Sequence, residues 1–105
     1  MKIVNRGFIS VKAKQPYIDW VNQFEDEFVM DIDSEPSIYL VEEDFFELEP
    51  VLKANFKKIF KNELEMITEE ASDFPPITLD NFLHWFSVEM GASVFDCQTD
   101  SLIAE

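Results

Sequence analysis

The sequence predicts an α+β fold, a two-layer sandwich in which three helices cover one face of a small three-stranded sheet. Residues 8–13 alternate between apolar and polar side chains, and longer segments carry apolar residues three and four positions apart. The chain holds only two glycines and has no Ser-, Gly- or Pro-rich stretch that would separate two parts. We therefore expect one continuous unit with the element order β-α-β-α-α-β.

The first strand is expected at residues 8–13, where alternate apolar side chains share one face: Ile9, Val11 and Ala13. Pro16 ends this strand because proline lacks the N–H that a strand ladder needs, yet proline suits the first turn of a helix. We expect that helix from about Pro16 to Val29. Its apolar stripe consists of Tyr17, Trp20, Val21, Phe24 and Phe28.

The second strand is expected at Ser37–Val41, a run of β-branched and aromatic residues that follows Pro36. If it lies beside the first strand, the helix between them predicts a parallel pair. The second helix is expected from Pro50 to Thr68, again because proline fits the first helical turn. Its apolar stripe consists of Leu52, Phe56, Ile59, Phe60, Leu64 and Ile67.

The third helix is expected to begin after Thr78, which suits an N-cap, and to end at Gly91, which suits a C-cap. Its apolar stripe consists of Leu79, Phe82, Leu83, Phe86 and Met90. The last strand is expected at residues 92–97, with Val94 and Cys97 buried. We place one compact domain at residues 1–97 and a frayed acidic tail at residues 98–105.

Cysteine usage and hydropathy indicate a cytoplasmic protein. Cys97 is the only cysteine, so no internal disulfide can form, and residues 1–6 lack the apolar segment of a secretory signal. No apolar run approaches the roughly 18 residues of a membrane span. A reducing compartment suits an unpaired thiol.

Charge is strongly unbalanced, with eight Lys and Arg against 22 Asp and Glu and a formal net charge of −14. All eight bases lie in residues 2–14 and 53–61, whereas residues 15–52 hold twelve carboxylates and no base. This surface opposes phosphate backbones and anionic membranes, so we expect no direct nucleic-acid partner and no membrane partner. A basic protein surface is the partner that fits. A small anion site becomes a candidate if Lys12, Lys14 and residues 53–61 converge in space.

The sequence offers few candidate residues for catalysis or metal binding. His84 and Cys97 are single residues of their types, which excludes a structural zinc site and leaves no nucleophile with a base and an orienting group. Two glycines 84 positions apart form no Gly-rich phosphate loop. Residues 31–42 match part of a calcium loop, but Pro36 stands where its sharp turn requires glycine. We therefore expect no enzyme, no cofactor and no bound metal.

The acidic segment before the second helix is the best candidate for a functional surface. It contains two adjacent phenylalanines, which cannot both face the core of one regular element. In one interpretation, one ring staples onto the helix start and the other packs under the connector. In the alternative, one ring is an exposed partner anchor within a charged rim. The candidate partner-binding residues are Asp31, Asp33, Glu35, Glu42, Glu43, Asp44, Phe45, Phe46, Glu47 and Glu49.

The function predicted from these patterns is that of a non-enzymatic acidic domain that binds another protein through this carboxylate-rich surface. A first alternative is a small enzyme or ligand-binding domain that uses the clustered carboxylates Glu42, Glu43, Asp44 and Glu47. A carboxyl group with a strongly raised pKa would favour that alternative. A second alternative is a structural homodimer joined through a sheet edge.

Overall fold

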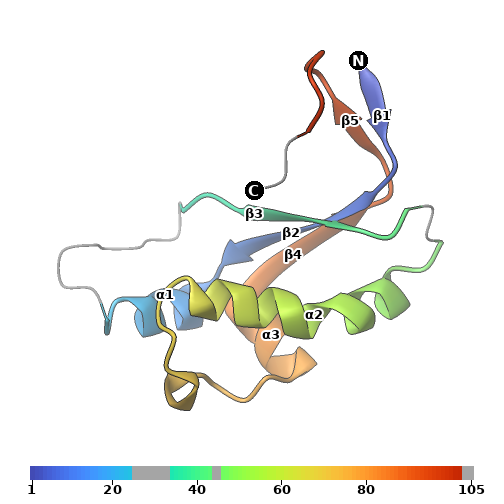
Figure 1. Ribbon diagram of the computed structural model, residues 1–105. Coiled ribbons are helices and arrows are strands. Elements are labelled where there is room, and N and C mark those ends of the chain that lie inside the picture. Colours follow the sequence, from blue (N-terminus) through green and yellow to red (C-terminus); the bar gives the residue numbers. More distant parts are fainter. Residues whose placement is uncertain (25–33, 44–45, 103–105) are drawn as a thin grey trace.

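The computed structural model describes residues 1–24, 34–43 and 46–102. The elements in chain order are β1 (Lys2–Val4), β2 (Gly7–Ala13), α1 (Gln15–Val21), β3 (Ser37–Val41), α2 (Leu48–Glu65), the 3-10 helix η1 (Ala71–Asp73), α3 (Leu79–Trp85), β4 (Phe86–Gly91) and β5 (Val94–Asp96). The predicted α+β class is confirmed, and the helices lie together on one side of a three-stranded sheet (Figure 1). Two strands, β1 and β4, were not part of the predicted order.

The three-stranded sheet has the order β3-β2-β4, and both strand pairs are antiparallel. The expected parallel pairing of the first two predicted strands is therefore wrong. Helix α1 has seven residues and rises about 10 Å, which does not carry the chain back along the roughly 23 Å of β2. Strand β3 instead begins opposite Val11, near the end of β2, and runs back along it.

Helix α1 ends at Val21 and a turn follows at residues 22–24, so the prediction of a helix to Val29 is wrong for the residues that the structure describes. Residues 25–29 of that prediction lie outside the described residues. The second predicted strand, Ser37–Val41, is confirmed with its bounds. The second predicted helix is confirmed at Leu48–Glu65, which begins two positions earlier and ends three positions earlier than expected.

The largest correction concerns the third predicted helix, which ends at Trp85 rather than at Gly91. Residues Phe86, Val88 and Met90 alternate along β4 and pair across the sheet with Ala13, Val11 and Ile9. Their spacing fits a strand as well as a helix. The strand forms because the second edge of β2 supplies backbone hydrogen-bond partners for it. Gly91 ends this strand opposite Phe8, where an added Cβ would lie 2.5 Å from the Phe8 ring.

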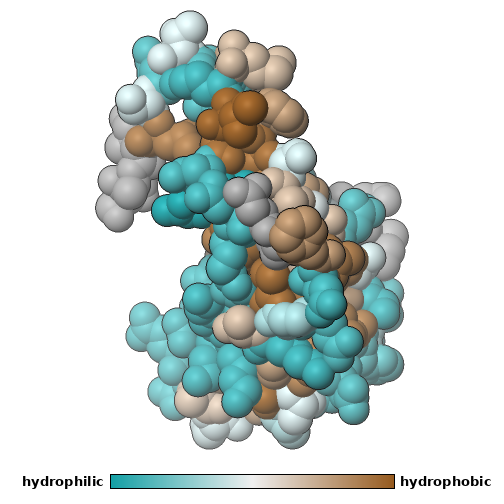
Figure 2. All heavy atoms as spheres, turned by 90° about the vertical axis from the view of Figure 1, so that its right-hand side faces the viewer, coloured by the Kyte–Doolittle hydropathy of each residue, from teal (hydrophilic) through white to brown (hydrophobic). Residues whose placement is uncertain are grey.

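Strands β1 and β5 form a separate two-stranded ribbon that projects beyond the helices (Figure 1). Ile3 pairs with Phe95, and both stay exposed, so the projecting lobe carries hydrophobic surface (Figure 2). The last predicted strand is shorter than expected, Val94 is half-buried rather than buried, and Cys97 is exposed rather than buried. Lys2 Nζ donates hydrogen bonds to the carbonyls of Thr99 and Asp100, 3.2 and 2.8 Å away, which holds the following residues against the ribbon.

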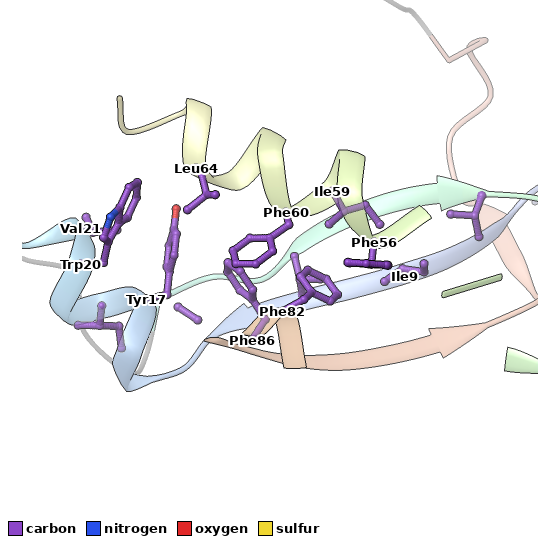
Figure 3. Packing of buried hydrophobic residues seen from close by; sticks show 14 of the residues in the cluster. Ile9, Tyr17, Trp20, Val21, Phe56, Ile59, Phe60, Leu64, Phe82 and Phe86 are labelled. Carbon is purple, nitrogen blue, oxygen red and sulfur yellow. The ribbon is translucent and has the colours of Figure 1, made fainter. Parts of the chain in front are cut away.

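The core lies between α2 and the inner face of the three-stranded sheet. Phe56, Ile59 and Phe60 of α2 point toward the sheet, and Phe82 and Phe86 meet them from the junction of α3 and β4 (Figure 3). The Phe60 and Phe86 rings lie edge to face with centroids 5.8 Å apart, a geometry worth about 0.5–1.5 kcal/mol beyond burial. This aromatic cluster fixes α2 across the sheet and leaves a groove along each side of the helix.

Candidate functional site

The predicted partner-binding residues fall into three groups. Asp31, Asp33, Asp44 and Phe45 lie outside the described residues. Glu35 is exposed ahead of β3, at the opposite end of that strand from Glu42, so the structure does not bring it to the others. The remaining residues lie between β3 and the first turn of α2 and are all exposed: Glu42, Glu43, Phe46, Glu47 and Glu49. We call residues 42–43 and 46–49 the acidic connection.

Phe46 is the residue just before the N-cap of α2, which is Glu47. A hydrophobic staple at this position would pack the ring against the fourth helical residue, Val51. Val51 is 6% exposed within the core, whereas Phe46 is 100% exposed. The staple is therefore not formed by Phe46, and a large apolar side chain stands free among carboxylates.

Glu42 is exposed as a residue, yet its carboxylate is held in place. The buried Asn55 side chain donates from Nδ2 to Glu42 Oε1 at 2.8 Å and to the Val51 carbonyl at 2.7 Å. A backbone hydrogen bond of Glu42 itself, the Asn55 amide and the charge of Lys58 lower the pKa of Glu42. A lowered pKa is opposite to what the carboxylate-enzyme alternative requires of this residue.

Glu49 lies in the first turn of α2, where a carboxylate complements the helix dipole. Lys53 Nζ lies 2.8 Å from Glu49 Oε1, one helical turn on. The hydrogen bond from Lys53 and its charge lower the pKa of Glu49. Both groups are exposed, so this pair contributes little to folding.

The structure places Lys12, Lys14 and Lys53 in three different surroundings. Lys12 pairs with Ser87 on the sheet face opposite the one that α2 covers. Lys14 donates from Nζ to the carbonyl of Leu83 at 3.0 Å, near the end of α3. Lys53 is one turn from the start of α2 and engages Glu49. The anion site that convergence would have supported is therefore not assembled by these residues.

A buried carboxyl group that the sequence reasoning missed lies on the inner side of α2. Glu63 is 5% exposed, and the Tyr39 hydroxyl donates to its Oε2 while the Ser37 hydroxyl donates to Oε1 at 3.4 Å. The Tyr17 hydroxyl donates to the Glu63 backbone carbonyl at 2.7 Å, and Asn62 Nδ2 donates to the Tyr39 oxygen at 2.9 Å. The network ties α2 to both α1 and β3.

Burial raises the pKa of Glu63, because desolvation disfavours the carboxylate more than the hydrogen bonds from Tyr39 and Ser37 favour it. Burial likewise raises the pKa of Tyr17 and Tyr39 above the ordinary phenol range. The sequence held a signal for this group. Glu63 lies three and seven positions after Phe60 and Phe56, inside the apolar stripe of the helix.

Two grooves flank α2. The polar groove, of about 330 Å³, runs between α2 and the edge strand β3 and is lined by Tyr39, Leu40, Val41, Asn55, Lys58, Ile59 and Asn62. The apolar groove, of about 400 Å³, runs between α2, α3 and the edge strand β4 and is lined by Leu48, Glu49, Leu52, Leu79, Leu83, Val88 and Met90. The acidic connection leads directly into the apolar groove, since Leu48 and Glu49 belong to both.

Among the residues that the structure describes, no group of three or more His, Cys, Asp or Glu side chains converges as a metal site. Within the same residues, no helix is long and apolar enough to cross a membrane. No protein-family model, curated protein or solved structure matches this chain.

Proposed function

We propose that this chain is a non-enzymatic protein-interaction domain that binds a basic protein surface through the acidic connection. The observation that carries the proposal is the full exposure of Phe46 between carboxylates of the same short segment. An aromatic ring inside a charged rim matches the common anatomy of protein interfaces, in which a few apolar anchors supply most of the affinity.

Charge supports the choice of partner. The net charge of −14 and the exposed carboxylates Glu43 and Glu47 beside Phe46 attract a cationic surface and raise its association rate. The same charge opposes direct binding to a nucleic-acid backbone, so a protein is the proposed partner. We propose the cytoplasm as its setting, on the ground that the only cysteine has no partner for an internal disulfide.

The proposal is tested by capture from a lysate of the source organism on three immobilised proteins: wild type, Phe46→Ala and Phe95→Ala. Phe95 is the matched control, because it is also an exposed aromatic but lies on the projecting ribbon. We expect a basic protein that wild type and Phe95→Ala retain, that Phe46→Ala loses and that added salt releases.

Equal capture by all three proteins would contradict the role given to Phe46. Capture that survives high salt and a Glu47→Lys change would contradict the electrostatic part of the proposal. An acidic control protein of similar charge separates specific partners from proteins that bind any polyanion.

A further inference from the structure

The apolar groove has features that the acidic connection does not explain. Its walls are leucines from two helices, and Leu48 and Leu83 remain 50% and 39% exposed although the adjacent core is fully packed. Monomeric proteins that leave such contiguous apolar surface open commonly use it for binding. The groove lies alongside β4, one of the two strands of this sheet that pair, within the described residues, on a single side.

Strand β4 pairs with β2 and forms one edge of the order β3-β2-β4. Its outer backbone N–H and C=O groups are a template for another strand. Natural edges are often blunted by Lys, Pro or inward-pointing charges, and the sequence Phe86–Gly91 has none of the three. Its charged residue, Glu89, pairs with Ser10 and so lies on the outer face of the sheet.

Side-chain alternation connects this edge to the groove. Val88 and Met90 of β4 pair with the buried Val11 and Ile9, so they lie on the helix-covered face and form one wall of the groove. A strand added beside β4 would direct every second side chain to that same face. Those side chains would meet Leu79 and Leu83 of α3 and the first turns of α2.

Charge indicates which residue types suit the remaining side chains of the added strand, those that face away from the groove. Glu49 lines the groove and is paired with Lys53, whereas Glu89 is exposed on the outer face of the edge strand. When the apolar residues of an added strand face the groove, the Lys or Arg residues between them face the outer side of the sheet, where Glu89 lies. An acidic segment would be repelled.

We infer that the edge of β4 and the apolar groove bind an extended segment of a partner protein, with alternating apolar and basic residues, as an added antiparallel or parallel strand. This inference rests on the proposed function for the basic character of the partner and adds the second surface and the binding mode. The apolar side chains fill the groove, the backbone extends the sheet, and the basic side chains lie on the outer face beside Glu89.

The probe is a synthetic peptide of about seven residues, a common strand length, that alternates Lys and Leu and is blocked at both ends. Two control peptides keep its composition: one places all Lys before all Leu, and one is N-methylated at every second residue, which removes ladder donors. Binding is followed by amide chemical shifts and by amide hydrogen exchange of the folded protein. We expect shifts and slowed exchange in Phe86–Gly91, and binding on the order of tenfold weaker for both control peptides.

Two protein variants complete the test. Leu83→Arg puts a cation into the groove and should weaken binding of the alternating peptide by about tenfold or more. Ile38→Arg is the matched control, because Ile38 is also exposed but lies on the outer face of the opposite edge strand, and its binding should equal that of wild type. Phe46→Ala should also bind the peptide as wild type does, since Phe46 is not part of the groove.

Each contrary result is distinct. Equal binding of the block or N-methylated peptide means attraction of charge alone and overturns the strand mode. Shifts confined to β3 place the segment at the other edge, and a concentration-dependent dimer that buries β4 means that a second copy is the occupant; both overturn the inference. If the peptide fails while Phe46-dependent capture of a partner holds, the inference falls and the proposed function stands.

Discussion

The two grooves beside α2 differ in the kind of contact that holds the helix against the sheet. On the β3 side, the polar groups Asn55 and Glu63 are buried and each receives or gives hydrogen bonds to that part of the chain. On the β4 side, leucines of α2 and α3 and the side chain of Val88 line the apolar groove, and Leu48 and Leu83 stay partly exposed. Both sides share the core rings Phe60 and Phe82.

The difference shows that a polar network can fasten one side of a helix while the other side is held by apolar contacts alone. Buried polar groups are costly unless paired, so the β3 side is fixed in one arrangement. Apolar contact has no such directional demand, and a surface that is only half covered still gains from a further apolar partner. The apolar groove is therefore the side on which an apolar partner would gain most from burial.

The largest expected effect compares two neighbours on α3. Phe82 is 0% exposed in the shared core, whereas Leu83 is 39% exposed in the wall of the apolar groove. Phe82→Ala should lower the free energy of unfolding by about 3–5 kcal/mol, and Leu83→Ala by less than about 1 kcal/mol. Urea denaturation measures both. Similar losses would mean that the groove is closed and belongs to the core.

The next effect tests the polar network on the β3 side. Asn55→Ala removes the amide that holds Glu42 and the Val51 carbonyl, and should cost about 1–3 kcal/mol of unfolding free energy. Lys57→Ala is the control on the same helix, because Lys57 is exposed, and its cost should stay within about 0.5 kcal/mol. Thermal denaturation of the two variants distinguishes them. An Asn55 variant as stable as wild type would show that the network does not fasten the helix.

A pH series sharpens the role of Glu63. Its pKa in the fold is raised above the ordinary 4.5, so the stability it contributes is complete below pH 4.5 and is lost as pH rises through the folded pKa. Glu63→Gln stays neutral and keeps an oxygen to accept from Tyr39. The free energy of unfolding of Glu63→Gln minus that of wild type should therefore increase from pH 4 to pH 8, because only wild type loses stability as Glu63 ionises.

Carboxylates with lowered pKa values, Glu42 and Glu49, act in the opposite direction, because the stability they contribute is present above pH 4.5 and is lost as pH falls. They are common to both proteins and cancel in the difference. A difference that does not change with pH would mean that Glu63 titrates as an exposed carboxyl group does. The measurement is equilibrium urea unfolding at intervals of one pH unit.

The smallest expected effect concerns the surface before α2. Phe46→Ala should leave the unfolding midpoint unchanged within error, since the ring is 100% exposed and buries no apolar area in the fold. Val51→Ala, at a buried position of the same helix, is the destabilising control. A clear loss of stability in Phe46→Ala would show that the ring packs in solution and would remove it as a partner anchor.

Local patterns predicted a large part of the fold. Alternation located the strand predicted at residues 8–13, which begins one residue earlier at Gly7, and β-branched and aromatic composition located Ser37–Val41 with its bounds. The apolar stripe located α2 within three residues at each end. These signals succeed because burial against a common core imposes a period of two on strands and of about 3.6 on helices.

The candidate site was predicted less completely. The exposed members of the acidic connection were named from composition, but Glu63 was not, although its position in the apolar stripe marked it. The grooves were not foreseen, because each is lined by segments far apart in the chain, such as Leu48 and Val88.

The sequence by itself determined the α+β class, the acidic surface and the principal helix of this protein, because composition and local periodicity carry that information. Only the tertiary structure decided that residues 86–91 form a strand, since Phe86 and Met90 fit both a helical stripe and an alternating strand. The second edge of β2 needed backbone partners, and pairing there outweighed the helical alternative. That same long-range pairing created the free edge and the groove on which binding is proposed.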